Sequence, residues 1–414
     1  MVLLDGAVEM AESCLRALAA GDDSVPCETV IVLNDPEAAL EDLVRKGTTG
    51  AEVVIARANA APGVGWNLAV KVARAPRLAT LHEDSEPDAG WLAPLCEAMS
   101  ESGAGVVGSR LYNRDGSVQN SGWVLFSDGS PRQINALTAP EAIASTDPTP
   151  ADLISGAAML LDRDAVRAVG GWDERFYPAV FMDMDMSTAI WNQGRLALSV
   201  PASGVRHQSG ALGRRQSTAL TGPLLARFLF ERHRDRFITK WGAAVRGLAP
   251  PPADEEPETI RAAVREALPR TRERAELIRS GNWRPSGPPA RAEHPLTGIP
   301  EPVLDGEDGT HTVAPEVDDA LDAAELRVID EYCRWLIDKE QSKTVELWDA
   351  QMLLQHRDRE LADVRRQNEA LQHQNQELAL ALDRIVHGLT WRLRTAIRRV
   401  ARAPLALFRR ARRG

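Results

Sequence analysis

The alternation of short apolar runs with helical patterns in the first 110 residues most constrains the fold. Residues 29–33 (TVIVL), 52–56 (EVVIA), 78–81 (LATL) and 105–109 have the composition of buried strands. Segments with helical periodicity separate them. This succession is typical of a parallel, doubly wound sheet, in which ligands bind beyond the carboxyl ends of the strands.

Cap and turn signals place the first helices between these strands. Asp35 and Pro36 have the character of an N-cap and a first helical position, opening a helix that runs through Arg45. Further helices are expected to begin near Trp66 and Asp88. The sequence therefore predicts one strand-helix unit after another up to residue 110.

After residue 110 the pattern becomes that of mixed α+β structure. A buried strand is expected over 153–161, a helix over 183–193, and a strand over 195–200 that ends in a Pro-Ala-Ser-Gly turn. A basic helix is expected over 218–241. These elements complete one predicted catalytic domain, residues 1–245.

Three further segments follow the predicted domain. Residues 246–317 are rich in proline and acids, which predicts a linker with a helical island over 258–278. Residues 318–389 carry a heptad pattern with Asn368 and Asn375 at a core position, which favours a homodimeric parallel coiled coil. A single long amphipathic helix packed on its own domain is the alternative.

The last segment, residues 390–414, is a basic amphipathic tail. Trp391, Leu393 and Phe408 stand among arginines, a composition that suits a helix lying on an anionic membrane surface. Docking onto an acidic patch of the protein itself is the alternative.

Composition excludes several classes of protein. The formal net charge of −10 argues against a general nucleic-acid binder. The four cysteines form no CxxC pair, which indicates reduced thiols in a cytosolic protein. No apolar stretch is long enough to span a membrane. We expect a cytoplasmic protein, held by its tail on the inner face of the plasma membrane.

An acidic cluster follows the predicted strand 78–81. Asp84 and Glu86 lie within the HEDSEP run, at the carboxyl edge of the expected sheet. Several carboxylates at a strand end suit a hard divalent cation, which prefers oxygen ligands. Such a cation can neutralise the charge that develops on a leaving diphosphate. The alternative is a solvated acidic loop.

A second acidic pair opens the predicted helix 183–193. Asp183 and Asp185 are flanked by methionines and a phenylalanine, which indicates partial burial and suits a desolvated general base. As ordinary acids at a helix N-terminus they would be unremarkable.

One histidine follows the predicted strand 195–200 and its turn. His207, in the run VRHQSG, is a plausible ligand if it lies near a carboxylate metal site. A lone histidine is otherwise more often a structural residue.

Together these motifs resemble family-2 glycosyltransferases with the GT-A fold, particularly bacterial enzymes that build rhamnose-containing and other surface polysaccharides. LHEDSEPDAGWL resembles the family's DxD metal region, and residues 153–176 resemble the segment on the acceptor side. FMDMDM resembles its F-E-D-x-D-L motif, and VRHQSG its late histidine. The resemblance covers roughly residues 1–240 and implies an α/β fold with a Rossmann-like, mostly parallel sheet.

The resemblance also implies a reaction. A sugar would pass with inversion from a UDP- or dTDP-linked donor to a lipid-linked or polysaccharide acceptor, with Mn²⁺ or Mg²⁺ as cofactor. Asp84 would be the principal metal ligand, with Glu86 and His207 as further ligands. Asp183 would be the general base, and Asp185 the second candidate. The remaining implied contacts are with the nucleotide (Asn34, Asp35, Asn67) and the acceptor (Trp172, Asp173, Glu174).

Three positions depart from the family pattern. His82 stands at the first acid of the DxD region, Met182 replaces the glutamate before the base, and the first strand is only Val2–Leu4. A catalytically degenerate GT-A scaffold that recruits a polysaccharide assembly to the membrane is therefore the alternative function. Nucleotidyl transfer is disfavoured, because a glycine-rich basic loop is expected after its first strand and LDGAVEMAE stands there.

Overall fold

The computed structural model describes residues 1–339 apart from 7, 22–23, 137, 140–145, 209–222, 289–303 and 308. The chain divides into two units, Met1–Tyr332 and Cys333–Gly414. The fold and the candidate site lie in the first unit. The predicted coiled coil from residue 340 onward and the predicted basic tail lie outside the described residues.

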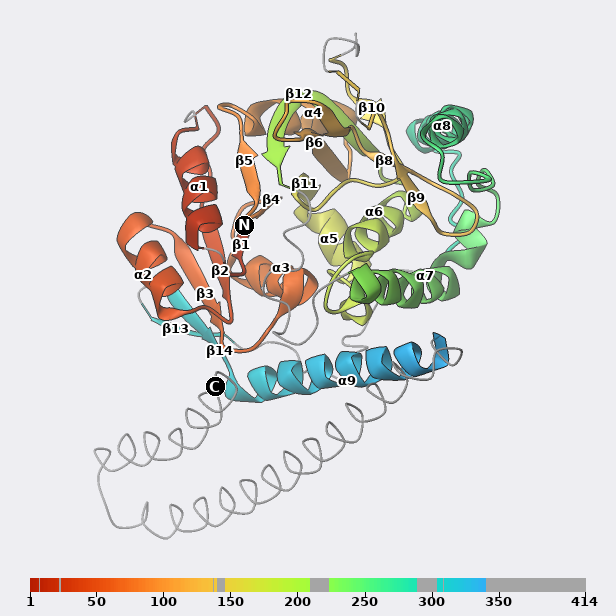
Figure 1. Ribbon diagram of the computed structural model, residues 1–414. Coiled ribbons are helices and arrows are strands. Elements are labelled where there is room, and N and C mark those ends of the chain that lie inside the picture. The colour runs from red at the N-terminus through yellow and green to blue at the C-terminus, as the bar shows by residue number, and fades with distance from the viewer. Residues whose placement is uncertain are drawn as a thin grey trace, which may run out of the picture. The chain divides into compact units, whose positions relative to one another are not determined.

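A single large mixed sheet forms the centre of the first unit (Figure 1). Its central strands, in spatial order, are β12 (Ala197–His207), β6 (Val106–Tyr112), β11 (Ala158–Asp162), β4 (Arg77–His82), β1 (Val2–Leu4), β2 (Val30–Asn34) and β3 (Glu52–Ala56). Strands β4, β1, β2 and β3 are parallel, and β6 is parallel to β12. Between these groups β11 runs antiparallel to both β4 and β6. The predicted α/β class is confirmed, with an antiparallel strand in the middle of the sheet.

Shorter strands extend the sheet or lie beside it. They are β5 (Ser85–Pro87), β7 (Val118–Asn120), β8 (Trp123–Leu125), β9 (Pro131–Gln133), β10 (Thr149–Pro150), β13 (Leu304–Glu307) and β14 (Thr310–Val313). Strands β8 and β9 form a separate two-stranded sheet.

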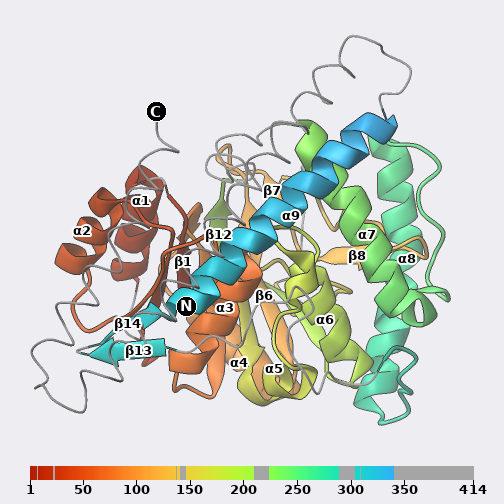
Figure 2. The same cartoon turned by 90° about the horizontal axis from the view of Figure 1, so that it is seen from below.

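Helices flank the sheet (Figures 1 and 2). They are α1 (Val8–Ala19), α2 (Ala38–Gly47), α3 (Ala61–Val72), α4 (Leu92–Ser102), α5 (Arg163–Val169), the 3-10 helix η2 (Glu174–Phe176), α6 (Met182–Asn192), α7 (Pro223–Val245), α8 (Pro257–Arg279) and α9 (Pro315–Lys339). None of the helices in the described part of the chain is long and apolar enough to cross a membrane.

Continuous apolar runs explain the central strands. All residues of β1 and β2 are buried, as expected for strands covered on both faces of a sheet. Helix α3 packs on this region closely enough that a Cβ on Gly65 would lie 2.6 Å from a methyl carbon of Leu3. Glycine at this position therefore allows the helix to approach the sheet.

Strand β12 continues well beyond its predicted end. The predicted Pro-Ala-Ser-Gly turn lies inside the strand, as an irregularity in its pairing with β6 between Val200 and Gly204. A bulge of this kind bends a strand without ending it. The strand then pairs antiparallel with β5, where His207 lies opposite Ser85. This extension carries His207 to the end of β4.

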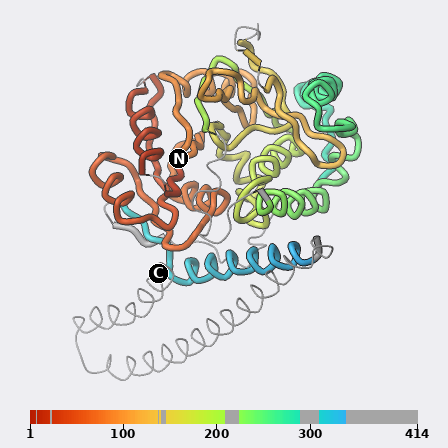
Figure 3. Tube along the Cα trace, in the orientation of Figure 1, coloured from red at the N-terminus to blue at the C-terminus, as the bar shows by residue number. Residues whose placement is uncertain are grey.

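The segment predicted as a linker differs from that expectation. Helix α8 corresponds to the expected helical island, but β14 pairs in parallel with β3 and extends the main sheet (Figure 3). The first turn of α9 is also attached there, because an Asp318 oxygen accepts hydrogen bonds from the backbone of Arg57 and Ala58 at 2.9 and 3.1 Å. Proline-rich composition did not reveal a short strand that forms only through long-range pairing.

The start of α2 also differs from the prediction. The helix begins at Ala38 with Glu37 before it, and Asp35 adopts a left-handed conformation with a φ of 42°. Aspartate tolerates this region better than most residues. Asp35 therefore forms the turn after β2, where its backbone N–H donates to the carbonyl of Ala56 at 2.9 Å.

Candidate metal and catalytic site

The end of β4 and the turn after it place two metal-ligand side chains together. His82 is the last residue of β4, and Glu83 and Asp84 form the turn into β5. The turn brings the Asp84 side chain back beside His82. The intervening Glu83 turns elsewhere and accepts a hydrogen bond from the backbone of Asp5 at 2.7 Å.

Strand β12 adds a third ligand candidate. His207 Nε2 lies 3.3 Å from Asp84 Oδ1, and the backbone N–H of Gln208 donates to the Asp84 carbonyl at 2.9 Å. The ring centroids of His207 and His82 are 6.2 Å apart, edge to face. Potential ligand atoms of His82, Asp84 and His207 all lie within 4.8 Å of one another. One ion could contact all three.

The neighbours of His207 fix its tautomer. Gln119 donates from Nε2 to the His207 carbonyl at 3.0 Å, so its Oε1 is the atom that faces the imidazole. His207 Nδ1 lies 2.8 Å from that oxygen and must donate to it. Nε2 is then the nitrogen that faces Asp84, and its lone pair becomes available to a metal ion when its proton is lost. Metal-binding histidines are typically oriented by such a second hydrogen bond.

His82 is held by aromatic stacking. Its ring lies nearly parallel to the indole of Trp66 on α3, with a centroid distance of 6.0 Å and an interplanar angle of 19°. His82 Nε2 is buried without a hydrogen-bond partner among the described residues. A buried polar atom without a partner is costly, and a bound cation would satisfy it. The residues present therefore fit a divalent metal ion.

The electrostatic environment keeps these groups in metal-binding form. Burial lowers the pKa of His82 below its ordinary value, which keeps the imidazole neutral at physiological pH. Burial alone would raise the pKa of Asp84, but the hydrogen bond and the charge of His207 bring it below its ordinary value. Asp84 is therefore a carboxylate between two histidines.

Asp183 faces the same cluster from the first turn of α6. Its Oδ2 accepts a hydrogen bond from the backbone N–H of Gly156 at 2.8 Å. Burial raises the pKa of Asp183, while the Gly156 hydrogen bond and the nearby His207 oppose that rise. A carboxylate with a raised pKa is a stronger base, as general-base catalysis requires.

The loop before β11 gives Asp183 close backbone contact. A Cβ on Gly156 would lie 2.5 Å from Asp183 Oδ1, so only glycine leaves room for the carboxylate. The Gly156 carbonyl accepts from Thr80 on β4 at 2.7 Å. Strand β4 therefore positions both the candidate base and the candidate metal ligands.

Asp185 lies in different surroundings. Lys240 Nζ on α7 lies 2.6 Å from Asp185 Oδ1, and the indole N–H of Trp241 donates to the same oxygen at 2.7 Å. Burial raises the pKa of Asp185, and the charge and hydrogen bond of Lys240 oppose that rise. The structure thus gives Asp185 a role in joining α6 to α7 and leaves Asp183 as the carboxylate beside the cluster.

Glu86 does not join the metal-ligand cluster. Its Oε1 accepts a hydrogen bond from Ser13 Oγ on α1 at 2.7 Å, and the described residues that could share an ion include His82 in its place. The turn at Glu83 and Asp84 reorients the chain, so the sequence spacing of Asp84 and Glu86 does not bring them to one side. A role of Glu86 as a metal ligand stays a prediction, and His82 is the third candidate beside Asp84 and His207.

The predicted nucleotide contacts lie near the carboxyl ends of β2 and β3. Asn34 is buried, and its Nδ2 donates to Asp5 Oδ1 at 2.7 Å and to Asn59 Oδ1 at 3.1 Å. Both of its side-chain protons are thereby used within the protein, which gives Asn34 a structural role. Asp35 is exposed beside it, and its contact with a nucleoside stays a prediction.

Asn67 anchors the loop predicted to contact the acceptor. Its Nδ2 donates to the Trp172 carbonyl at 3.0 Å and to Glu174 Oε1 at 3.2 Å, and its Oδ1 accepts from the Trp172 N–H at 2.9 Å. Trp172, Asp173 and Glu174 have exposed fractions of 0, 1 and 2%. These side chains pack inside the protein, and a contact with an acceptor or a nucleotide stays a prediction.

Sequence reasoning missed three supporting residues of the site. Trp66, Gln119 and Gly156 orient His82, His207 and Asp183 respectively. No local pattern marks Trp66 or Gln119, since their roles depend on contacts between distant segments. His82 itself carried a signal, the two-residue spacing from Asp84 at a strand end.

Comparison with known proteins agrees with the motif analysis. Residues 8–170 match the sequence profile described as Glycosyl transferase family 2, which confirms the predicted resemblance. Asp183 and His207 lie beyond the matched residues. No curated protein matched the sequence.

Several solved structures are similar, each at 15% identity. They are GalNAc-T7 with UDP, GalNAc and Mn²⁺ (TM-score 0.44, covering 70% of this chain and 58% of that one), S. aureus TarS (0.37, 50% and 36%), and the mannosyltransferase PcManGT from Pyrobaculum calidifontis with GDP-Man and Mn²⁺ (0.43, 85% and 85%). This chain spans less than two thirds of the first two structures.

Proposed function

Because residues 8–170 of this chain match the sequence profile of glycosyl transferase family 2, we propose that it is an inverting, metal-dependent glycosyltransferase. It moves a sugar from a UDP- or dTDP-linked donor to a lipid-linked or polysaccharide acceptor in cell-surface glycan synthesis. The observation that carries this proposal is the juxtaposition of His82, Asp84 and His207 with the partly buried carboxylate of Asp183.

The metal would be held by His82 Nε2, Asp84 and His207 Nε2. When bound, Mn²⁺ or Mg²⁺ neutralises the charge that develops on the leaving nucleoside diphosphate. The mixed nitrogen and oxygen ligands favour Mn²⁺ over Mg²⁺, which prefers oxygen ligands. Gln119 keeps the His207 proton on Nδ1, so that its Nε2 stays available.

The proton-transfer step falls to Asp183. Its carboxylate takes the proton of the acceptor hydroxyl as that oxygen attacks the anomeric carbon, from the face opposite the leaving diphosphate. A single displacement of this kind inverts the anomeric configuration. Burial of Asp183 strengthens it as a base, and the Gly156 N–H fixes its orientation.

The remaining segments suggest where the enzyme works. The heptad pattern beyond residue 339 supports a homodimer through a coiled coil, and the basic tail 390–414 supports attachment to an anionic membrane surface from the cytoplasmic side. Attachment there would bring the site to lipid-linked acceptors.

Calorimetric titration with UDP and dTDP, with and without Mn²⁺, tests the proposed donor site. The wild type is expected to bind one nucleotide only when Mn²⁺ is present. His82→Ala and Asp84→Ala should lose that metal-dependent binding, because each removes a ligand.

Glu86→Gln is the matched control, because Glu86 lies in the same short segment but contacts Ser13. It should bind like the wild type. Loss of binding in Glu86→Gln with retention in His82→Ala would contradict the ligand set. If a folded wild type bound neither nucleotide with metal, the scaffold function would replace the catalytic one.

A further inference from the structure

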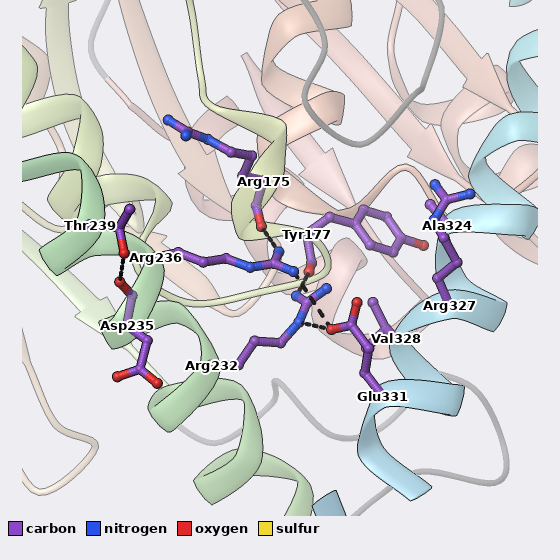
Figure 4. Close-up of a pocket in the computed structure, with 10 residues that line it drawn as sticks. All are labelled: Arg175, Tyr177, Arg232, Asp235, Arg236, Thr239, Ala324, Arg327, Val328 and Glu331. Carbon is purple, nitrogen blue, oxygen red and sulfur yellow. Dashed lines mark hydrogen bonds and ion pairs between the residues drawn. The ribbon is translucent and has the colours of Figure 1, made fainter. Parts of the chain in front are cut away.

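A cavity of about 400 Å³ lies between α7, α9 and the loop that contains η2 (Figure 4). Helix α9 is attached at its first turn through Asp318 and near residue 332 through Tyr332, whose ring is 5.3 Å from that of Phe228 on α7. The cavity opens between these two attachments. Its volume falls within the usual range of small-ligand sites.

Arginine dominates the charge of this cavity. Arg175, Arg232, Arg236 and Arg327 line it together with two acids, Asp235 and Glu331, which leaves a formal excess of two positive charges. They come from three elements that are distant in sequence. Convergence of guanidinium groups from separate elements is typical of sites that bind phosphate or carboxylate.

One carboxylate serves two of these arginines. Figure 4 shows Arg232 and Arg236 pointing from α7 toward Glu331 on α9, while the Asp235 carboxylate points away. Arg232 forms an ion pair with Glu331, and Arg236 Nη2 lies 3.6 Å from the same oxygen. Arg232 Nη1 also donates to the Tyr177 carbonyl at 2.8 Å. Among the described residues that line the cavity, no second carboxylate forms an ion pair with Arg232 or Arg236.

The surroundings make this positive charge costly. Burial, together with the charges of Arg232 and Arg175, lowers the pKa of Arg236 to about 10 despite the opposing charge of Glu331. Arg175 is oriented toward Asp173, with Nη2 2.6 Å from Oδ2. Arg236 Nη1 donates to the Arg175 carbonyl, so the capacity to bind an anion rests on the remaining donors of Arg232 and Arg236.

We propose that this cavity is an anion site for a phosphate ester or diphosphate, held by Arg232 and Arg236 and closed by Arg327. A diphosphate would compete with Glu331 for the two guanidinium groups and match their planar donors. Val328, Ala324 and the Tyr177 ring supply an apolar wall, which suits a phosphate carried on an organic group. The site is separate from the candidate metal cluster and independent of the proposed transfer reaction.

Calorimetric titration with inorganic pyrophosphate, in EDTA and at constant ionic strength, tests this site on the full chain. The wild type should bind, and Arg236→Gln should weaken binding by about tenfold or more, because it removes a charge-assisted contact. Arg327→Gln, on the opposite wall, should weaken it as well without altering α7. Glu331→Gln should instead strengthen binding, because it removes the competing carboxylate.

Arg234→Gln is the matched control, because Arg234 is on α7 but does not line the cavity. It should bind like the wild type, and so should Asp84→Ala. Absence of wild-type binding, equal weakening in Arg234→Gln and Arg236→Gln, or loss of binding in Asp84→Ala would each overturn the proposal.

Titration with a short-chain prenyl diphosphate distinguishes two kinds of natural ligand. Tighter binding than that of pyrophosphate assigns the site to a lipid-linked diphosphate, and equal binding assigns it to a soluble one.

Discussion

Because of His233 on α7, the free energy of unfolding is expected to fall as the pH falls. Its side chain is fully buried, and its ring lies 5.6 Å from that of Phe176. Nε2 lies 2.7 Å from Arg232 Nη1, and since arginine only donates, this nitrogen must be the acceptor. Burial, reinforced by the charges of Arg232 and Arg236, lowers the pKa of His233 to about 3.

The direction of the pH effect follows from these contacts. An unfolded histidine takes up a proton near pH 6.5, but native His233 does not until about pH 3. Between these values the unfolded state binds one more proton, so stability falls as the pH falls. From pH 7 to pH 5 the loss from this one group is about 2 kcal/mol. That figure holds for any native pKa well below 5.

Urea unfolding of the wild type and of His233→Gln at pH 7 and pH 5 measures this effect. Glutamine keeps an acceptor for Arg232 and cannot gain a proton in this range. The variant should therefore lose about 2 kcal/mol less than the wild type over the interval, whatever its stability at pH 7. Equal losses in the two proteins would refute a neutral, buried His233.

Three further substitutions test other contacts. Gln119→Leu should weaken Mn²⁺ binding about 10- to 100-fold in a metal titration, because it frees the imidazole of His207 to rotate; unchanged affinity would refute the orienting role. Gly156→Ala should lower kcat about 100-fold with the fold intact by circular dichroism, because the added methyl displaces Asp183; normal turnover would exclude Asp183 as the base. Lys240→Met should destabilise the protein by about 3–5 kcal/mol in urea unfolding, because it leaves the buried Asp185 without its cation, whereas Asp173 keeps Arg175; a loss below about 1 kcal/mol would show that other groups compensate.

Local patterns predicted the elements of the sheet well. The apolar runs ending near Leu33, Ala56 and Leu81 are strands β2, β3 and β4, with differences of a residue or so at their ends. Their burial depends on their own composition, which the sequence displays directly. The hairpin β13–β14 was missed because its pairing with β3 joins segments about 250 residues apart.

The candidate site was only partly predictable for the same reason. Asp84, Asp183 and His207 carried motif signals, and the structure brings them to one place. The place of His82 in this cluster depends on the turn at Glu83, which brings Asp84 beside it. Asp185 could not be separated from Asp183 by sequence, because its partners are on α7.

Anomalous diffraction from crystals grown with Mn²⁺ and the nucleotide that binds tests the metal centre most directly. We expect a single strong manganese peak coordinated by His82 Nε2, Asp84 and His207 Nε2, with Asp183 beside the position of the donor sugar. A peak coordinated by Glu86 without His82, or no manganese in this cluster despite bound nucleotide, would contradict the proposed site.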